Sequence, residues 1–213
     1  MLEIQQTTDT NSRKPVTAKK NTDNKLDRIN LMVVDGSSKS GELIKSILNQ
    51  LGFKNVFIAH NGLEGAQLLR EVRIDLIFTD WELYVPTKPP SDDEAAPKPE
   101  VKSLNGAQFV KGLRFSSTAP NPFVPVIMLL RLASHDNISQ ARDSGVNEVV
   151  IKPFSADDLC RKIMKIIDTP RPFITASTYK GPCRRKVKNA LPENGVERRR
   201  RDVRLFRLDE HFN

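Results

Sequence analysis

Two aspartates and one lysine stand where three apolar runs of the sequence end. They are Asp35, Asp80 and Lys152. In open sheets of parallel strands, ligands bind beyond the carboxyl ends of the strands, so we expect these side chains to converge at one edge. A carboxylate beside a cation suits a nucleophile whose neighbour neutralises an incoming phosphoryl group. The alternative is that each aspartate only caps the turn after its strand.

The elements that must position these residues alternate along the chain. Near-continuous apolar runs predict strands at 29–35, 55–59, 75–80, 124–130 and 148–151. Apolar residues at helical spacing predict helices around 43–51, 63–72, 109–113, 138–146 and 159–167. Strand and helix alternating five times predict an α/β fold, a doubly wound five-stranded parallel sheet with helices on both faces.

Composition divides the chain into three parts. Residues 1–27 are rich in Thr, Asn, Lys and Gln and predict a disordered leader. Residues 28–168 hold the alternating pattern, which is interrupted at 85–103 by a stretch with five prolines and few apolar residues. We interpret this stretch as an inserted loop, because the pattern resumes after it. Residues 169–213 form a basic tail.

The net charge of +8 in 213 residues is concentrated in that tail. Residues 169–213 carry 12 basic and 5 acidic side chains, whereas 28–168 carry 17 of each. This distribution argues against a histone-like protein that binds nucleic acid over its whole surface. The apolar run 126–130 is far shorter than the ~20 residues of a membrane helix, and the N-terminus lacks a signal-peptide pattern. The two cysteines, Cys160 and Cys183, cannot form a disulfide framework and show no metal-ligand spacing. We therefore expect a protein of the reducing cytoplasm, without a membrane span.

Residues 29–168 resemble a CheY-like response-regulator receiver domain. The matching segments are Val33–Asp35, Asp75–Trp81, Pro125–Met128, Ala141–Val146 and Lys152–Phe154. The resemblance implies the strand order 2-1-3-4-5 and a cis bond between Lys152 and Pro153. It also implies that Asp80 accepts a phosphoryl group from a histidine kinase or phosphotransfer protein and that Lys152 contacts that group. The expected output is binding to another protein, with no enzymatic activity.

Three positions depart from the family pattern. Gly36 replaces an acid that ligates Mg²⁺ in the family, Leu130 replaces a hydroxyl residue, and Val149 replaces the switch aromatic. Loss of one carboxylate weakens a Mg²⁺ site built on Asp35 and Asp80. Glu82 is the candidate replacement ligand, although its charge could equally repel a phosphoryl group.

The tail contains two copies of a Gly-x-x-Arg-Arg-basic pattern. Its candidate ligand-binding residues are Arg184, Arg185, Arg198, Arg199, Arg200, Arg201 and Arg204. Guanidinium groups bind phosphate and guanine, so we expect the tail to be poorly ordered until it binds an anion, with cyclic di-GMP as first candidate. The layout is similar to alphaproteobacterial CheY-like regulators with an arginine-rich extension, some of which bind cyclic di-GMP and act on the flagellar motor. Nucleic acid, anionic lipid or an acidic protein would use the same side chains.

Three functions therefore stay open. The first is a phosphorelay receiver whose output is protein binding. The second is a degenerate receiver that binds cyclic di-GMP or another anion through its tail. The third is a scaffold or nucleic-acid-associated protein with a receiver core that is no longer used. No nucleophile–base pair or phosphate loop outside the receiver site suggests an independent enzyme.

Overall fold

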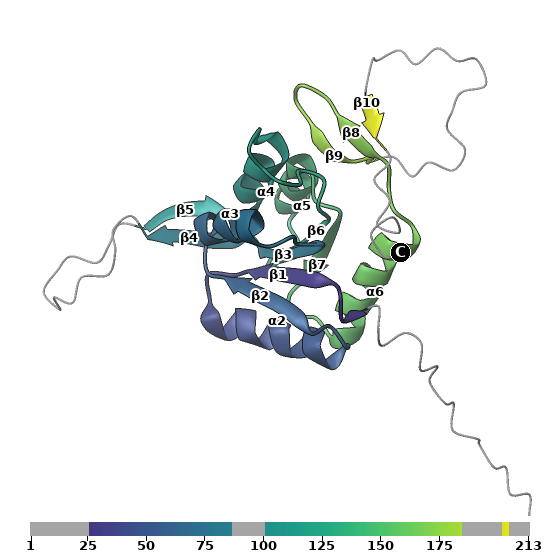
Figure 1. Cartoon of the computed structure of the whole chain (residues 1–213). Helices are drawn as coiled ribbons and strands as arrows, with labels where there is room; N and C mark the ends of the chain where they lie inside the picture. Colours follow the sequence, from purple (N-terminus) through teal and green to yellow (C-terminus); the bar gives the residue numbers. More distant parts are fainter. Residues whose placement is uncertain (1–25, 87–100, 185–201, 205–213) are drawn as a thin grey trace, which may run out of the picture.

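The computed structural model describes residues 26–86, 101–184 and 202–204 (Figure 1). Its strands are β1 (Asn30–Val34), β2 (Asn55–Ala59), β3 (Leu76–Asp80), β4 (Glu82–Pro86), β5 (Val101–Asn105), β6 (Val126–Leu130), β7 (Glu148–Ile151), β8 (Phe173–Thr175), β9 (Lys180–Pro182) and β10 (Asp202–Arg204). Its helices are α2 (Ser38–Gln50), α3 (Gly62–Glu71), α4 (Gly106–Phe115), α5 (His135–Ser144) and α6 (Ala156–Asp168).

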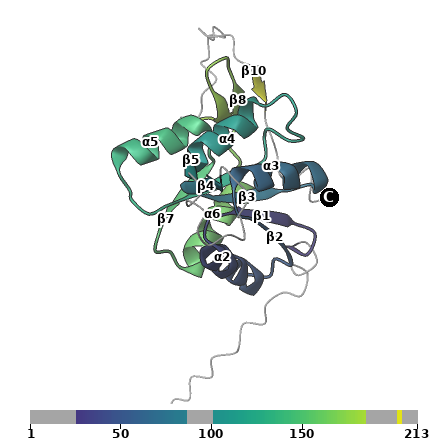
Figure 2. The ribbon, with the colours of Figure 1, turned by 90° about the vertical axis from the view of Figure 1, so that its left-hand side faces the viewer.

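Five parallel strands form the central sheet, in the order β2-β1-β3-β6-β7. Figures 1 and 2 show α2 and α6 on one face of this sheet and α3, α4 and α5 on the other. Alternate residues of each strand point to opposite faces. In β1, Met32 and Val34 enter the core under α3–α5, and Leu31 and Val33 enter the core under α2 and α6. The predicted doubly wound fold and strand order are confirmed.

The helices begin close to the carboxyl ends of the strands because polar side chains cap them there. The side chains of Ser37, Asn61, Asn105, Ser134 and Ser155 each accept a hydrogen bond from a backbone N–H in the first turn of the following helix. Such caps satisfy N–H groups that have no partner within the helix. They fix the short connections that surround the strand ends.

A hairpin interrupts the alternation directly after β3. β4 and β5 pair antiparallel, from Glu82 opposite Asn105 to Pro86 opposite Val101. The range 85–103, interpreted from the sequence as a loop, therefore has strand structure at both of its ends. Residues 87–100 lie outside the described part of the chain.

The chain beyond α6 folds back onto the domain. β8 and β9 form an antiparallel hairpin, and the Phe173 side chain is buried with its ring edge-to-face on Phe123, 4.9 Å between centroids. β9 passes so close to α5 that a Cβ on Gly145 would lie 2.3 Å from the Lys180 carbonyl oxygen. The expectation of a tail that is poorly ordered from residue 169 is therefore wrong for residues 173–182, because Phe173 supplies an apolar anchor.

The other terminal predictions lie outside the described residues. These are residues 1–25 of the predicted leader and residues 185–201 and 205–213 of the tail. Only the backbone of β10 is described between those last two ranges, where it pairs antiparallel with β8. Within the described ranges, no helix combines the length and apolar character needed to cross a lipid bilayer.

Candidate functional site

The three strand-end residues meet at one edge of the sheet, as the sequence predicted. Lys152 Nζ lies 3.2 Å from Asp35 Oδ2 and 3.0 Å from Asp80 Oδ1. The Asp35 and Asp80 side chains are 1% and 8% exposed, and the Lys152 side chain is 20% exposed. The Lys152–Pro153 bond is cis, as the resemblance implies. One ammonium group thus contacts two buried carboxylates.

Asp35 is held in place by the start of α2. Its Oδ1 accepts a hydrogen bond from the Ser37 backbone N–H at 2.9 Å, and its Oδ2 accepts one from the Ser40 hydroxyl at 2.6 Å. Lys152 Nζ also lies 3.3 Å from Ser40 Oγ. Ser40 was missed by sequence reasoning, and its only signal is its place in the first turn after a strand that ends in an acid. Its hydroxyl fixes the orientation of Asp35 and Lys152 together.

Asp80 is the less satisfied of the two carboxylates. Lys152 Nζ is within ion-pair distance of its Oδ1, but off the direction that a hydrogen bond requires, so this buried oxygen has no hydrogen-bond partner among the described residues. Burial raises the pKa of Asp80, Lys152 opposes this effect, and the nearby charge of Asp35 adds to it, so that the pKa is raised overall. Folding therefore opposes the charge on Asp80, and a group that binds this oxygen would relieve the cost.

Gly106 places the backbone of α4 directly against Asp80. Its N–H donates to the Trp81 carbonyl oxygen at 2.7 Å, and a Cβ on Gly106 would lie 2.1 Å from the Asp80 carbonyl oxygen. Only glycine fits such an approach without moving the backbone. The sequence showed Gly106 only as part of an Asn-Gly pair, with nothing to indicate which backbone it would meet.

Glu82 does not join this group. Its carboxylate pairs with Arg131, with Glu82 Oε2 2.7 Å from Arg131 Nη1. Both side chains of this pair are exposed to solvent; Glu82 begins β4, and Arg131 directly follows β6. The structure therefore brings together two of the three acids predicted for a metal site.

The remaining departures from the family pattern also lie near the strand ends. Leu130 is the fully buried last residue of β6, and its carbonyl oxygen accepts the Lys152 backbone N–H at 2.7 Å. It contributes a backbone acceptor here and no side-chain hydroxyl. Val149 is partly buried in β7. Gly36 is exposed in the turn between Asp35 and α2.

The donor set fits Mg²⁺ poorly. Mg²⁺ prefers oxygen ligands in octahedral geometry. No cluster of three or more His, Cys, Asp or Glu side chains that could hold a metal ion exists in the ranges that the structure describes. Asp35 already accepts hydrogen bonds at both of its oxygens.

Gly36→Asp is expected to strengthen Mg²⁺ binding about tenfold or more. It adds a carboxylate next to Asp35, which supplies Coulomb attraction and one more ligand. The partly buried Trp81 follows Asp80, so a Mg²⁺ titration of the variant and the parent can be read from its fluorescence. Equal affinities would show that another group already fills this ligand position.

Of the seven tail arginines predicted to bind a ligand, Arg184 is the one whose side chain the structure describes. Its Nη1 lies 2.7 Å from Asp143 Oδ1, and its guanidinium lies 4.1 Å from the centre of the Tyr179 ring. Arg185 and Arg198–Arg201 lie outside the described residues, and Arg204 is described only by its backbone in β10. Binding of cyclic di-GMP through the tail stays a prediction.

The chain is similar in sequence to chemotaxis proteins. No model of a known protein family matches it. The chemotaxis protein CheY1 of Helicobacter pylori strain J99 is 30% identical over 142 residues, which cover 65% of this chain and 97% of that protein. The chemotaxis protein CheY of Pseudomonas aeruginosa is 28% identical over 138 residues, which cover 65% of this chain and 95% of that protein.

Solved structures agree on the fold. The chemotaxis protein CheY4 of Vibrio cholerae matches with a TM-score of 0.50 at 22% identity, over 65% of this chain and 98% of that one. A signal receiver domain from Pseudomonas fluorescens matches with a TM-score of 0.51 at 16% identity, over 66% of this chain and 95% of that one. These matches agree with the fold, and the sequence relative that is 30% identical and matched over 97% of its length shows that the chain belongs to the CheY-like response-regulator receiver family of two-component signalling.

Proposed function

We propose that this receiver is phosphorylated on Asp80 by a histidine kinase or phosphotransfer protein and acts by binding an output protein, without enzymatic activity of its own. The observation that carries the proposal is the position of Asp80, buried at the end of the central strand with Lys152 Nζ 3.0 Å from its Oδ1. Asp35 is held by Ser37 and Ser40 and serves to place Lys152.

The geometry suits phosphoryl transfer to a carboxylate. A carboxylate oxygen of Asp80 attacks the phosphorus of a phosphohistidine, an O–P bond forms, the P–N bond breaks, and the histidine nitrogen leaves with the bonding pair. Lys152 neutralises part of the charge on the phosphoryl oxygens during this step. Leu130 supplies no hydroxyl, so one charge-assisted hydrogen bond to those oxygens, about 1.5–3 kcal/mol, is missing. We therefore expect slower phosphorylation than in a receiver with Thr at this position.

Treatment with acetyl phosphate and Mg²⁺ is expected to add one phosphoryl group at Asp80. Mass spectrometry of the intact chain should show the added mass, and hydroxylamine should remove it because it is an acyl phosphate. Peptide mapping then identifies the residue. Asp80→Asn should abolish the adduct, since it lacks the nucleophilic oxygen pair.

Asp157→Asn is the matched control, because Asp157 is an exposed acid in the first turn of α6. This variant should be modified like the parent. An adduct on another residue, or no adduct under conditions that fully modify a CheY control, would contradict the proposal. The second outcome would favour the degenerate receiver.

A further inference from the structure

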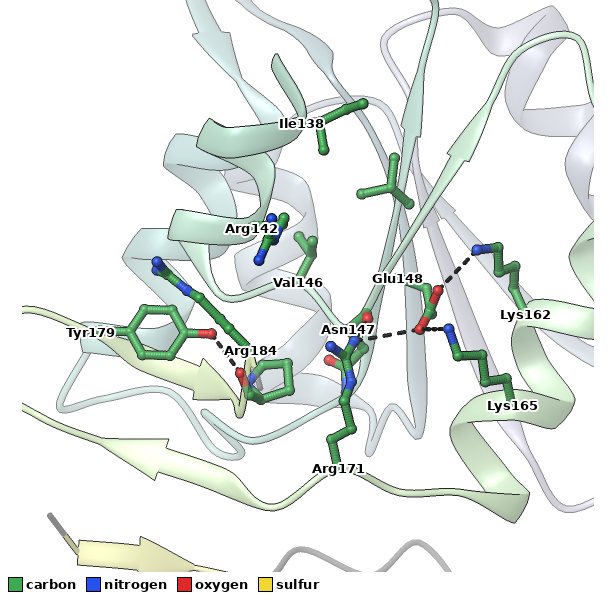
Figure 3. Close-up of a pocket in the computed structure, with 12 residues that line it drawn as sticks. Ile138, Arg142, Val146, Asn147, Glu148, Lys162, Lys165, Arg171, Tyr179 and Arg184 are labelled. Atoms are coloured by element: carbon green, nitrogen blue, oxygen red, sulfur yellow. Dashed lines mark hydrogen bonds and ion pairs between the residues drawn. The ribbon is translucent and has the colours of Figure 1, made fainter. Parts of the chain in front are cut away.

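A cavity lies away from the strand-end site, between α5, β7, α6 and the β8–β9 hairpin (Figure 3). Its volume is about 240 Å³. It is lined by Ile138, Arg142, Val146, Asn147, Glu148, Val149, Lys162, Lys165, Arg171, Tyr179, Pro182 and Arg184. None of these residues belongs to the Asp35–Asp80–Lys152 group, so this cavity is a separate feature of the molecule.

The cavity is strongly basic. Its five cationic side chains come from α5, α6, the segment after α6 and the segment after β9, and they are Arg142, Lys162, Lys165, Arg171 and Arg184. Glu148 is the one acid that lines it. Cations gathered from separate elements around a hollow repel one another, and a bound anion relieves that repulsion.

The cavity already stabilises one negative charge, the carboxylate of Glu148. Its carboxylate lies 2.7 Å from Lys165 Nζ, 2.9 Å from Lys162 Nζ and 3.4 Å from Arg171 Nη2. Burial alone would raise the pKa of Glu148, but hydrogen bonds from the two lysines and their charges hold it below its usual value. The cavity therefore stabilises an oxyanion already present in the chain.

Arg142, the cation on α5, is available to bind an anion. Arg142 is exposed, and its side chain has no hydrogen bond or ion pair within the part of the chain described by the structure. Arg184, on the same side of the cavity, is held over the Tyr179 ring (Figure 3). One of its nitrogens, Nη1, pairs with the exposed Asp143, so a phosphate would bind the other N–H donors of this guanidinium or displace Asp143. A guanidinium offers paired N–H donors that match phosphate oxygens.

Part of the lining is apolar. Ile138 and Val146 come from α5 and its exit, Val149 from β7, and Pro182 from β9. Small-molecule sites typically combine such walls with a few convergent polar groups. Inorganic phosphate would use only the charged side of this cavity, whereas an organic group would also remove apolar surface from water.

We propose that this cavity binds a small organic phosphate, with its phosphate group at Arg142 and Arg184 and its organic part against the wall formed by Ile138, Val146 and Val149. The site shares no residue with the Asp35–Asp80–Lys152 group. Because Tyr179 and Arg184 come from the hairpin and its exit, the ligand also ties the hairpin to α5.

Calorimetric titration of the full chain with inorganic phosphate, pyrophosphate, ribose 5-phosphate, AMP, GMP and cyclic di-GMP tests the proposal. The organic phosphates should bind more tightly than inorganic phosphate. Arg142→Gln should weaken their binding about 10- to 100-fold, as expected for loss of a charge-assisted hydrogen bond. The matched control is Arg70→Gln, because Arg70 is an exposed arginine in the last turn of α3, and its affinities should equal those of the parent.

Glu148→Gln gives an independent measure, because it removes the negative charge that lines the cavity and would repel a bound phosphate. It should bind organic phosphates more tightly than the parent. The proposal is overturned if no organic phosphate binds at millimolar concentration, if inorganic phosphate binds equally well, or if Arg142→Gln and Arg70→Gln behave alike. Binding of an acidic peptide in place of every phosphate compound would instead assign the cavity to a protein partner.

Discussion

Lys152→Met is expected to lower the free energy of unfolding by about 3 kcal/mol. Removing one partner from a buried ion pair costs about 3–5 kcal/mol, and the lower end applies because the Lys152 side chain keeps one-fifth of its exposure. The variant leaves the buried carboxylates of Asp35 and Asp80 together without their shared cation. In urea unfolding the midpoint should fall accordingly, and the melting temperature should drop by about 6–12 °C.

A second substitution identifies the cause of that loss. Asp80→Asn removes a carboxylate whose pKa is raised by burial, so folding opposes its charge and the single variant should be more stable than the parent. Combined with Lys152→Met, it should recover much of the lost stability. Lys54→Met removes a lysine that pairs with Asp27 at the surface and should cost at most about 1 kcal/mol. Equal effects of Lys152→Met and Lys54→Met would contradict the buried-pair account.

Arg114→Leu is expected to destabilise the protein by about 3–5 kcal/mol and to release the β8–β9 hairpin. Arg114 is fully buried, and its guanidinium donates to the carbonyl oxygens of Gly145, Pro122 and Val124 at 2.7–3.2 Å. It also lies over the Phe173 ring, 5.2 Å from its centre. Leucine would leave three carbonyl oxygens without their donor, at about 1–3 kcal/mol for each that stays buried.

Two measurements separate the global effect from the local one. Urea unfolding reports the loss of stability, and hydrogen exchange of the β8 and β9 amides reports release of the hairpin. Arg70→Leu, at an exposed position, should change neither by much. If hairpin exchange in Arg114→Leu rises only as much as exchange in the central sheet, the proposed link between Arg114 and the hairpin is wrong.

The central sheet and the charged strand ends could be predicted from the sequence because both depend on local patterns. Buried parallel strands are continuous apolar runs, and the residue that ends each run must lie at the edge of the sheet. The sequence alone therefore predicts that Asp35, Asp80 and Lys152 lie close together. The cis bond before Pro153 followed only from the resemblance.

Other parts of the site depend on contacts that no local pattern encodes. Ser40 contacts Lys152, which is 112 residues away in the sequence, and Gly106 meets the Asp80 carbonyl oxygen across a hairpin. Glu82 was expected near Asp80 because it is two residues away, but the start of β4 directs it to Arg131. In the sequence, Arg114 looks like an ordinary surface cation on a helix, whereas in the structure it is buried and donates to three carbonyl oxygens.

The basic cavity was hidden for a related reason. Its cations are spread from Arg142 to Arg184, and the hairpin that closes it has strands of three residues each, too short for a periodic pattern. The sequence drew attention to the dense arginine runs further along the tail. The cations of the cavity instead stand apart from one another in the sequence, and the fold brings them together.

The contacts of Gly106 beside Asp80 indicate which part of this receiver can change in sequence without moving Asp80. The Gly106 N–H donates to the Trp81 carbonyl oxygen, and Glu82 lies opposite Asn105 in the β4–β5 ladder, so the chain that leaves Asp80 is held against the chain that returns to α4. Trp81 and Glu82, which make these contacts, are the two residues that follow Asp80 in the chain. Substitutions, insertions or deletions between β4 and β5 are therefore expected to leave Asp80 in its place.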